Sequence, residues 1–326
     1  MRAPRQKAAL APQHANRTPQ RTVRTPQSGV AIVLAMGVVA FAALAATAIM
    51  VSQSTWSRQV ELTAGHAQAQ LLMQAGLDWA RAVLSDDRHA SNVDHLGEPW
   101  ALRLPPIPVD NGSLAGHIED QQGKFNLNNL VKDGKVNLAQ LAHFRRLLSI
   151  LDLPPALAGA LADWIDADGE PQPQDGAEDA YYGSLQPPYL AANRPLIDVG
   201  ELALVRGFDD NVRARLRPFV TALPRITAVN ANTASPEVLA AVVEGLVLDR
   251  ARALVAKREG TFFRNFSDFF DLLPPGLIVP TDSISVSSDY FIATTRITIG
   301  GAQARGSALL AREKTGWPAI VWRKFP

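Results

Sequence analysis

Residues 30–51 read VAIVLAMGVVAFAALAATAIMV, a run of 22 apolar or small residues without a charge. At about 1.5 Å per residue, a helix of this length crosses a bilayer. Residues 1–29 before it contain six Lys or Arg and no Asp or Glu. Because basic flanks stay in the cytoplasm, we expect one membrane span, with the N-terminus cytoplasmic and the bulk of the chain across the membrane.

Three kinds of N-terminal segment share this pattern. A secretory signal cut after Ala46-Thr47-Ala48 would release a soluble protein, and an uncleaved anchor would keep the whole chain. A pilin-type signal is cut before the apolar run, which is then retained. Gln27-Ser28-Gly29 followed by Val30 favours the third, because it resembles a prepilin-peptidase site, with Gly before a hydrophobic first mature residue. A glycine there lets a peptidase approach an extended backbone closely.

Beyond the apolar run, helical periodicity continues, and no proline interrupts residues 30–84. A single helix over this range would be about 80 Å long. The alternative is two helices joined by a hinge at Gly65 or Gly76, since glycine weakens a helix. The apolar residues recur at three- and four-residue steps, as on one face of an amphipathic helix: Trp56, Val60, Ala64, Ala67, Leu71, Ala75, Trp79 and Val83. We interpret both tryptophans as packing residues.

Composition narrows the function classes. The chain has 326 residues, 47% hydrophobic residues and a net charge of +1, which suits one anchored protein with one or two compact domains. The absence of cysteine excludes thiol nucleophiles, disulfides and cysteine-ligated metals. The six histidines show no zinc spacing, and no Gly-x-Ser-x-Gly motif is present. The sequence therefore predicts that the protein is not an enzyme.

Patterns in the rest of the chain predict an α+β protein. Residues 114–130 alternate weakly, as short strands would. Residues 284–322 alternate around Gly300-Gly301, which indicates a hairpin and a last strand. Between these two regions, N-cap residues and apolar periodicity predict helices. They are expected after Asn137, from Pro154 to Ile165, as two short helices around Gly207 within residues 196–219, from Ser235 to about Leu246, and from Asp249 to Arg258.

Segments along the chain resemble the minor pseudopilin K family of type II secretion systems. They follow one another in the order of the family, and the acidic stretch followed by two tyrosines is the most specific of them. The segments are GKFNLNNL (123–130), DWIDADGEP (163–171), GAEDAYY (176–182), NRP (193–195), VNANTA (229–234) and SSDYF (287–291).

This resemblance implies a fold: a pilin-like long N-terminal helix, an antiparallel sheet and a large inserted helical domain of SAM-like or helix-hairpin-helix-like type. The expected parts are a cytoplasmic prepilin leader that is removed (1–29), a transmembrane helix (30–51), a periplasmic amphipathic helix (52–98), a pilin-like α/β domain (99–135 and 225–326) with a helix-hairpin-helix-like segment (229–273), and the inserted helical domain with an acidic calcium loop (136–224).

The resemblance also implies a function: a minor pseudopilin at the tip of the pseudopilus in the bacterial inner membrane, which initiates or limits assembly so that folded proteins are exported. Implied partners are minor pseudopilins I and J, then H and the major pseudopilin, with cleavage and methylation by prepilin peptidase. Most pilins have Glu at the fifth mature position, whereas this chain has Leu34. The K family lacks that Glu, which suits a first subunit with no earlier amine to pair with.

Seven carboxylates crowd into residues 163–179, without Lys or Arg. Turn-forming Gly and Pro prevent them from pointing apart, and like charges repel. A hard cation such as calcium, which takes six to eight oxygens, would relieve this repulsion, although a solvated acidic loop remains the alternative. The spacing is not that of an EF-hand. The resemblance implies structural calcium bound by Asp166, Asp168, Glu170, Glu178 and Asp179, with Asp163 and Asp175 as further candidates.

A second function is compatible with residues 229–273, which also resemble helix-hairpin-helix modules of DNA-uptake proteins. In such modules a Gly-x-Gly turn presents backbone amides to a phosphate. Here the turn, residues 244–248, has one Gly and an acid. Cations on the following helix suit a solvated face equally well: Arg250, Arg252, Lys257 and Arg258. The alternative is a membrane-anchored periplasmic DNA-binding protein; we expect no nucleic-acid partner.

Overall fold

The structure is a computed structural model that describes residues 28–109, 112–277, 279–280, 282–299, 302–313 and 316–325. The predicted leader lies outside these residues, apart from its last two positions. The chain divides into two compact units, residues 1–63 and 64–326. Helix α1, Ser28–Ala90, contributes to both units.

The first unit consists of the N-terminal part of α1. Its apolar run is exposed except at the half-buried Ala45, with Val30 64% and Val51 61% exposed. By length and composition α1 is apolar enough to cross a membrane, with a mean hydropathy of 2.5 in its most apolar window. The helix begins at Ser28, so Gly29 and Val30 lie in its first turn. Helical structure therefore begins before the apolar run.

Helix α1 is continuous through Gly65 and Gly76, so neither glycine forms a hinge. It extends beyond residue 84, the end of the predicted single helix, and ends at Ala90, before the predicted end of the amphipathic helix at residue 98. Arg88 and His89 lie in its last turn, where positive charge favours the helix dipole. Residues 91–98 turn back toward the sheet, and Asp94 and Glu98 are buried there. The end of the helix is thus set by contacts of the following loop.

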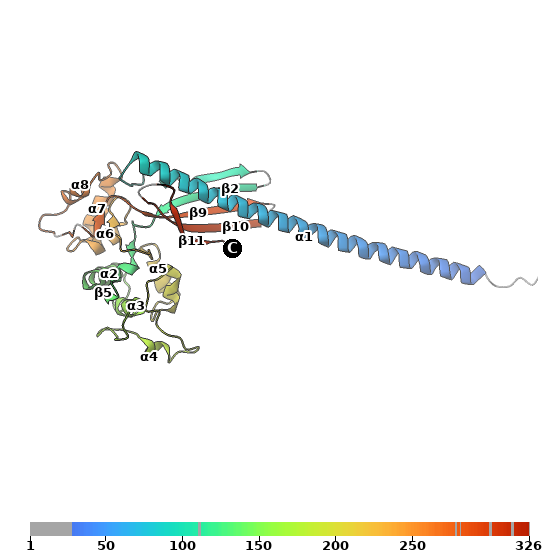
Figure 1. The fold of residues 1–326 in the computed structure, drawn as a ribbon, viewed down its shortest axis with the longest axis horizontal. Helices are drawn as coiled ribbons and strands as arrows, with labels where there is room; N and C mark the ends of the chain where they lie inside the picture. Colours follow the sequence, from blue (N-terminus) through green and yellow to red (C-terminus); the bar gives the residue numbers. More distant parts are fainter. Residues whose placement is uncertain are drawn as a thin grey trace, which may run out of the picture. The chain divides into compact units, whose positions relative to one another are not determined.

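The second unit contains a five-stranded antiparallel sheet in the order β1-β2-β9-β10-β11. The strands are β1 (Leu104–Val109), β2 (Gly112–Asp120), β9 (Tyr290–Ile299), β10 (Ala302–Ala311) and β11 (Ala319–Lys324). The C-terminal part of α1 packs on one face of this sheet (Figure 1). Leu77 and Leu84 of α1 meet Ile118, Phe291 and Leu310 in a buried cluster.

A helical region is inserted between β2 and β9 (Figure 1). Its elements are β3 (Phe125–Asn126), β4 (Val131–Lys132), β5 (Lys135–Val136), α2 (Leu138–Ile150), α3 (Leu157–Ile165), α4 (Asp179–Tyr182), α5 (Asp210–Leu216), β6 (Val220–Thr221), β7 (Val229–Asn230), α6 (Pro236–Val242), α7 (Leu248–Arg258), α8 (Phe266–Phe270) and β8 (Ile284–Ser285), with 3₁₀ turns at Leu127–Leu130 and Val199–Leu204. The predicted α+β fold, with a long helix, an antiparallel sheet and inserted helices, is confirmed.

One hydrophobic core joins both halves of this insertion. It includes Phe125 and Phe144 from the first half and Val238 and Phe269 from the second. The inserted helical domain was expected to span residues 136–224, but side chains from outside these limits belong to the same core. Packing thus extends the helical region from about residue 121 to residue 289, between the strands that flank it.

Local signals placed several helix starts correctly. The Asn137 side chain accepts hydrogen bonds from the first turn of α2, and Ser235 caps α6 ahead of a proline. Three expectations differ from the structure. Helix α3 begins at Leu157 and not at Pro154, and α6 ends at Val242 and not near Leu246. Residues 127–130 form a 3₁₀ turn and not a strand, because the Asn126 side chain accepts from the Asn128 amide and closes the turn.

The two candidate hinge glycines of α1 provide a matched pair of variants. A Cβ at Gly76 would lie 2.9 Å from Cγ2 of Thr295 on β9, whereas one at Gly65 would meet nothing within 4 Å. Gly-to-Ala replacement stabilises an open helix by up to about 1 kcal/mol. We expect Gly65→Ala to raise the melting temperature of the full chain in detergent and Gly76→Ala to lower it. A rise for both variants would mean that α1 does not pack this closely on β9.

Candidate functional site

The acidic stretch forms a loop between α3 and α4 that folds back on itself. Three of its carboxylates converge: Asp166, Asp168 and Glu178 offer oxygens that all lie within 4.8 Å of one another. Asp166 and Glu178 are buried, whereas Asp168 is exposed. The cluster therefore has one open side and three hard oxygen ligands, which is a donor set that suits a divalent cation.

The buried Asp163 organises this loop. It lies on the last turns of α3 and is fully buried. Its carboxylate accepts a hydrogen bond of 2.7 Å from the Ala177 amide and two of 3.1 Å from the Gln172 amide. A Cβ at Gly176 would lie 2.5 Å from Asp163 Oδ2, so the chain can only pass this carboxylate with glycine there. These contacts turn residues 172–177 back toward α3 and bring Glu178 beside Asp166.

The two buried carboxylates of this cluster have oxygens that no described residue reaches with a hydrogen-bond donor. Among the described residues, both oxygens of Glu178 and Oδ1 of Asp166 are buried without a partner. Burial raises the pKa of Asp166 to about 7, helped by Asp168 and Asp163. Burial also raises the pKa of Glu178 to about 7, with Asp163 and Asp166 adding repulsion. Orphaned buried carboxylate oxygens cost free energy unless a cation or a proton joins them.

The other predicted ligands lie elsewhere in the loop. Glu170 is exposed, and its own amide donates to Asp168 Oδ1 at 3.0 Å. Asp179 Oδ1 accepts from the Ala191 amide at 2.9 Å, which links α4 to the following segment. Asp175 is exposed, with a φ of 64°. The structure thus brings together three of the five predicted ligands and does not bring Glu170 or Asp179 into the cluster.

A second group of carboxylates, which the sequence did not indicate, already has its cation. Asp87, Asp94 and Glu98 converge around Arg312 at the end of β10. The Arg312 side chain is 1% exposed and pairs with Asp87 at 2.7 Å and Asp94 at 2.5 Å. Its guanidinium also lies over the Phe291 ring, 4.8 Å from the centroid. No local pattern indicates this cluster, because Arg312 and Asp87 are 225 residues apart.

The segments VNANTA (229–234) and SSDYF (287–291) are joined by hydrogen bonds next to this cluster. Asn230 Nδ2 donates to Asp120 Oδ2 at 3.2 Å and to Ser288 Oγ at 2.9 Å. Ser288 donates from its backbone amide to Asp94 Oδ2 at 2.7 Å. Burial raises the pKa of Asp120 to about 6, against the lowering effect of the hydroxyls of Thr233 and Ser288. These polar residues tie the helical region to the sheet and to the loop after α1.

Two cations of the helix-hairpin-helix-like segment have partners within the protein. Arg258 donates to the Ala231 carbonyl at 2.6 Å, and burial lowers the pKa of its guanidinium to about 10. Arg252 pairs with Asp249 at 2.9 Å. The turn between α6 and α7 has Gly245 at φ 81° beside Glu244, whose side chain is 82% exposed. An exposed acid at this turn opposes the approach of a phosphate.

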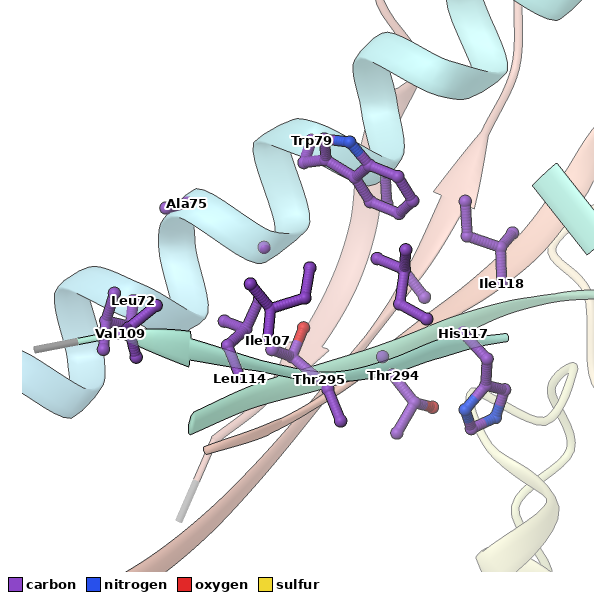
Figure 2. A pocket seen from close by; sticks show the side chains of 16 residues that line it. Leu72, Ala75, Trp79, Ile107, Val109, Leu114, His117, Ile118, Thr294 and Thr295 are labelled. Carbon is purple, nitrogen blue, oxygen red and sulfur yellow. The ribbon is translucent and has the colours of Figure 1, made fainter. Parts of the chain in front are cut away.

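An apolar groove lies between α1 and the edge of the sheet (Figure 2). Its volume is about 310 Å³, and α1, β1, β2 and β9 form its walls. Trp79 of α1 and Ile107 of β1 face each other across it, and they are 42% and 43% exposed. Trp79 thus does not pack into a closed core. The side chains of His117 and Thr294 point to the opposite face of the sheet (Figure 2).

Known proteins resemble this chain in sequence and in fold. Models of the family described as type II secretion system protein K match residues 123–225 and 229–287. The type II secretion system protein K of Pseudomonas aeruginosa is 36% identical, over 91% of this chain and 92% of its own length. That of Aeromonas hydrophila is 34% identical, over 79% of this chain and 84% of its own.

A solved structure agrees with these matches. The crystal structure of the GspK-GspI-GspJ complex from the type 2 secretion system of enterotoxigenic Escherichia coli contains a chain that is 27% identical. The two folds superpose with a TM-score of 0.72, which covers 82% of this chain and 99% of that one. Sequence relatives, both family models and the fold therefore agree, and the chain belongs to the type II secretion system protein K family.

Proposed function

We propose that this protein is the minor pseudopilin at the tip of the type II secretion pseudopilus, where it initiates or limits assembly for the export of folded proteins across the outer membrane. Its proposed partners are minor pseudopilins I and J, then H and the major pseudopilin beneath them. The observation that carries the proposal is the similarity to a chain solved in a GspK-GspI-GspJ complex, over 99% of that chain. The family is one of structural pseudopilins, and the protein is not an enzyme.

The N-terminus supports a terminal position in the filament. Under the proposal, prepilin peptidase cuts between Gly29 and Val30, the helix of residues 30–51 stays in the inner membrane, and the second unit is periplasmic. The fifth mature residue is then Leu34, which cannot pair with the amine of an earlier subunit. A buried carboxylate would need such a partner. The helical region of residues 121–289 adds bulk that a tip accommodates more easily than the body of a packed filament.

The groove beside α1 is the surface we assign to a partner pseudopilin. Exposed apolar patches on soluble domains mark interaction sites, and tryptophans are enriched among the residues that dominate interfaces. Trp79 and Ile107 at its mouth are both less than half exposed, so a partner side chain inserted between them would be largely desolvated. An apolar partner surface would stabilise this complex mainly by burial of these walls.

We expect the soluble part from about Ser52 to form a one-to-one-to-one complex with the equivalent parts of minor pseudopilins I and J, measured by light scattering with calcium. Trp79→Glu should weaken this complex at least about tenfold, because it introduces a charge into the groove. Trp317→Glu is the matched control, since Trp317 is 54% exposed and outside the groove. Absence of a complex when all three parts are folded would contradict the tip assignment.

Calcium is the ion that we propose for the acidic loop, with a structural role. Asp166, Asp168 and Glu178 bring three carboxylates to one point, and calcium tolerates the irregular geometry that such a loop imposes. The orphaned oxygens of Asp166 and Glu178 support this assignment. A bound cation would hold the loop against α3 and α4. Glu170 and Asp179 remain candidate ligands only if the loop rearranges on binding.

The DNA-binding alternative has less support. Arg252 and Arg258 have partners within the protein, and Glu244 is exposed at the turn that would face a phosphate. Retention of duplex DNA at physiological salt would favour the alternative. A weak shift that disappears with salt would reflect nonspecific attraction.

A further inference from the structure

The face of the sheet opposite α1 forms one wall of a polar cleft of about 580 Å³. Residues of β2, β9, β10 and β11 line this wall, and α5 with the 3₁₀ turn Val199–Leu204 lines the other. His117 and Thr294, which point away from the apolar groove in Figure 2, belong to this wall. The cleft shares His117 and Thr294 with the lining of the groove that we assign to a partner pseudopilin, but its other residues differ from those of the groove. None of its lining residues belongs to the acidic loop.

The charges of this cleft do not balance. Its lining contains five Lys or Arg and three Asp or Glu. Each acid has a cation already: Glu119 pairs with Lys124 at 3.0 Å, Asp198 with Lys324 at 2.8 Å, and Asp210 with Arg213. Within the part of the chain that the structure describes, Arg217 and Arg305 have no ion-pair partner. They come from opposite walls, Arg217 directly after α5 and Arg305 from β10, and both are exposed.

Two hydrogen-bond donors in the same lining lack acceptors. Nε of Arg213 and Nε1 of Trp322 are buried without a partner among the described residues. A buried donor without an acceptor costs free energy. Burial, followed by Arg103 and then Arg305, lowers the pKa of His117, while Glu119 acts in the opposite direction. Unpaired cations from two walls thus meet in one cleft, and a ligand with carboxylate oxygens would pair with both of them.

We infer that this cleft binds an acidic peptide segment of another protein. Charge complementarity to Arg217 and Arg305 identifies the ligand as anionic. The apolar parts of the lining, Val199, Ile292 and Trp322, favour a peptide over a simple inorganic anion, because ligand sites combine apolar walls with a few polar groups. This binding site does not depend on the tip assignment.

The test uses the purified full chain in nonionic detergent and a fluorescein-labelled hexaglutamate peptide, with hexaglutamine as the neutral probe. Fluorescence anisotropy at low salt should show saturable binding of hexaglutamate alone, which added salt weakens. The double variant Arg217→Gln/Arg305→Gln should bind about tenfold more weakly, because two charge pairs are lost. Arg250→Gln/Arg264→Gln is the matched control, since it removes the same charge from exposed positions outside the cleft.

A further variant distinguishes loss of binding from a folding defect of the arginine variant. Ala214 lines the cleft and is exposed, so Ala214→Glu adds a repelling charge without removing a side-chain contact. It should weaken hexaglutamate binding as the arginine variant does. Equal binding of hexaglutamate and hexaglutamine, or unchanged binding in both cleft variants, would overturn the inference. Displacement of hexaglutamate by inorganic phosphate at the same molar concentration would also overturn it, because it would mean a simple anion site.

Discussion

Replacing Arg312 by methionine is expected to lower the free energy of unfolding of this protein by about 3–5 kcal/mol, because it leaves buried carboxylates without their cation. The Arg312 side chain is 1% exposed and holds Asp87 and Asp94 at 2.7 Å and 2.5 Å. Methionine keeps an unbranched aliphatic stem, but it removes the charge, the donors and the contact of the guanidinium with the Phe291 ring. Thermal unfolding of the full chain in detergent measures the loss. Arg323→Met is the matched control, since Arg323 is exposed on the neighbouring strand β11.

The loss in the Arg312 variant should depend on pH. Burial already raises the pKa of Asp87 to about 6, with repulsion from Glu98 and Asp94 added to it. Without Arg312 this pKa rises further, so the folded protein keeps a proton that the unfolded chain releases near pH 4. Stability is then retained at low pH and lost as the pH rises through the folded-state pKa. We expect a larger loss at pH 8 than at pH 5, and an equal loss at both would contradict this explanation.

A second substitution tests whether the destabilisation arises from unpaired charge. Asp94→Asn in the Arg312→Met background removes one of the carboxylates left without a cation. It should restore part of the lost stability, whereas Asp94→Asn alone should destabilise the protein. If the two losses simply add, the residues are not coupled, and the contribution of Arg312 lies in packing on Phe291.

Removal of calcium is expected to lower the melting temperature by about 5–10 °C. A ligand at about 100 times its dissociation constant stabilises the folded state by about 2.7 kcal/mol, and 1 kcal/mol shifts the melting temperature of a domain of this size by about 2–4 °C. The measurement compares millimolar calcium with millimolar EDTA. Asp166→Asn should abolish the difference, and Asp271→Asn, at an exposed position outside the loop, should leave it unchanged.

The calcium effect should grow with pH. The pKa values of Asp166 and Glu178 are raised to about 7, above their values of about 4 in an unfolded chain. Without calcium, the folded protein therefore holds protons between pH 4 and pH 7 that the unfolded chain releases, so stability falls across this window as the pH rises. Calcium must displace these protons. We expect a small calcium effect at pH 5 and the full effect at pH 8. An unchanged melting temperature in EDTA at pH 8 would contradict the calcium site.

The acidic loop illustrates what a single sequence can predict about a site. Seven carboxylates among turn-forming residues predict crowded negative charge, because that inference needs only composition and local geometry. The sequence does not show which carboxylate oxygens converge on one point. Asp163 looked like a possible ligand, yet its carboxylate is used by the Gln172 and Ala177 amides. Asp163 takes this role because α3 is buried in the helical core, and the local sequence does not show that burial.

The sequence by itself determined the long helix, the apolar run within it and several helix caps. These features depend on apolar runs, on 3.6-residue periodicity and on a side chain bonding to its own turn, all of which are local. Tertiary structure decided the Arg312 cluster, the shared core of the helical region and the two clefts of the sheet. Asp87 and Arg312 lie 225 residues apart, and the face on which Arg305 lies depends on the register of β9 and β10. Strand pairing and core packing set such placements through long-range contacts, which no local pattern encodes.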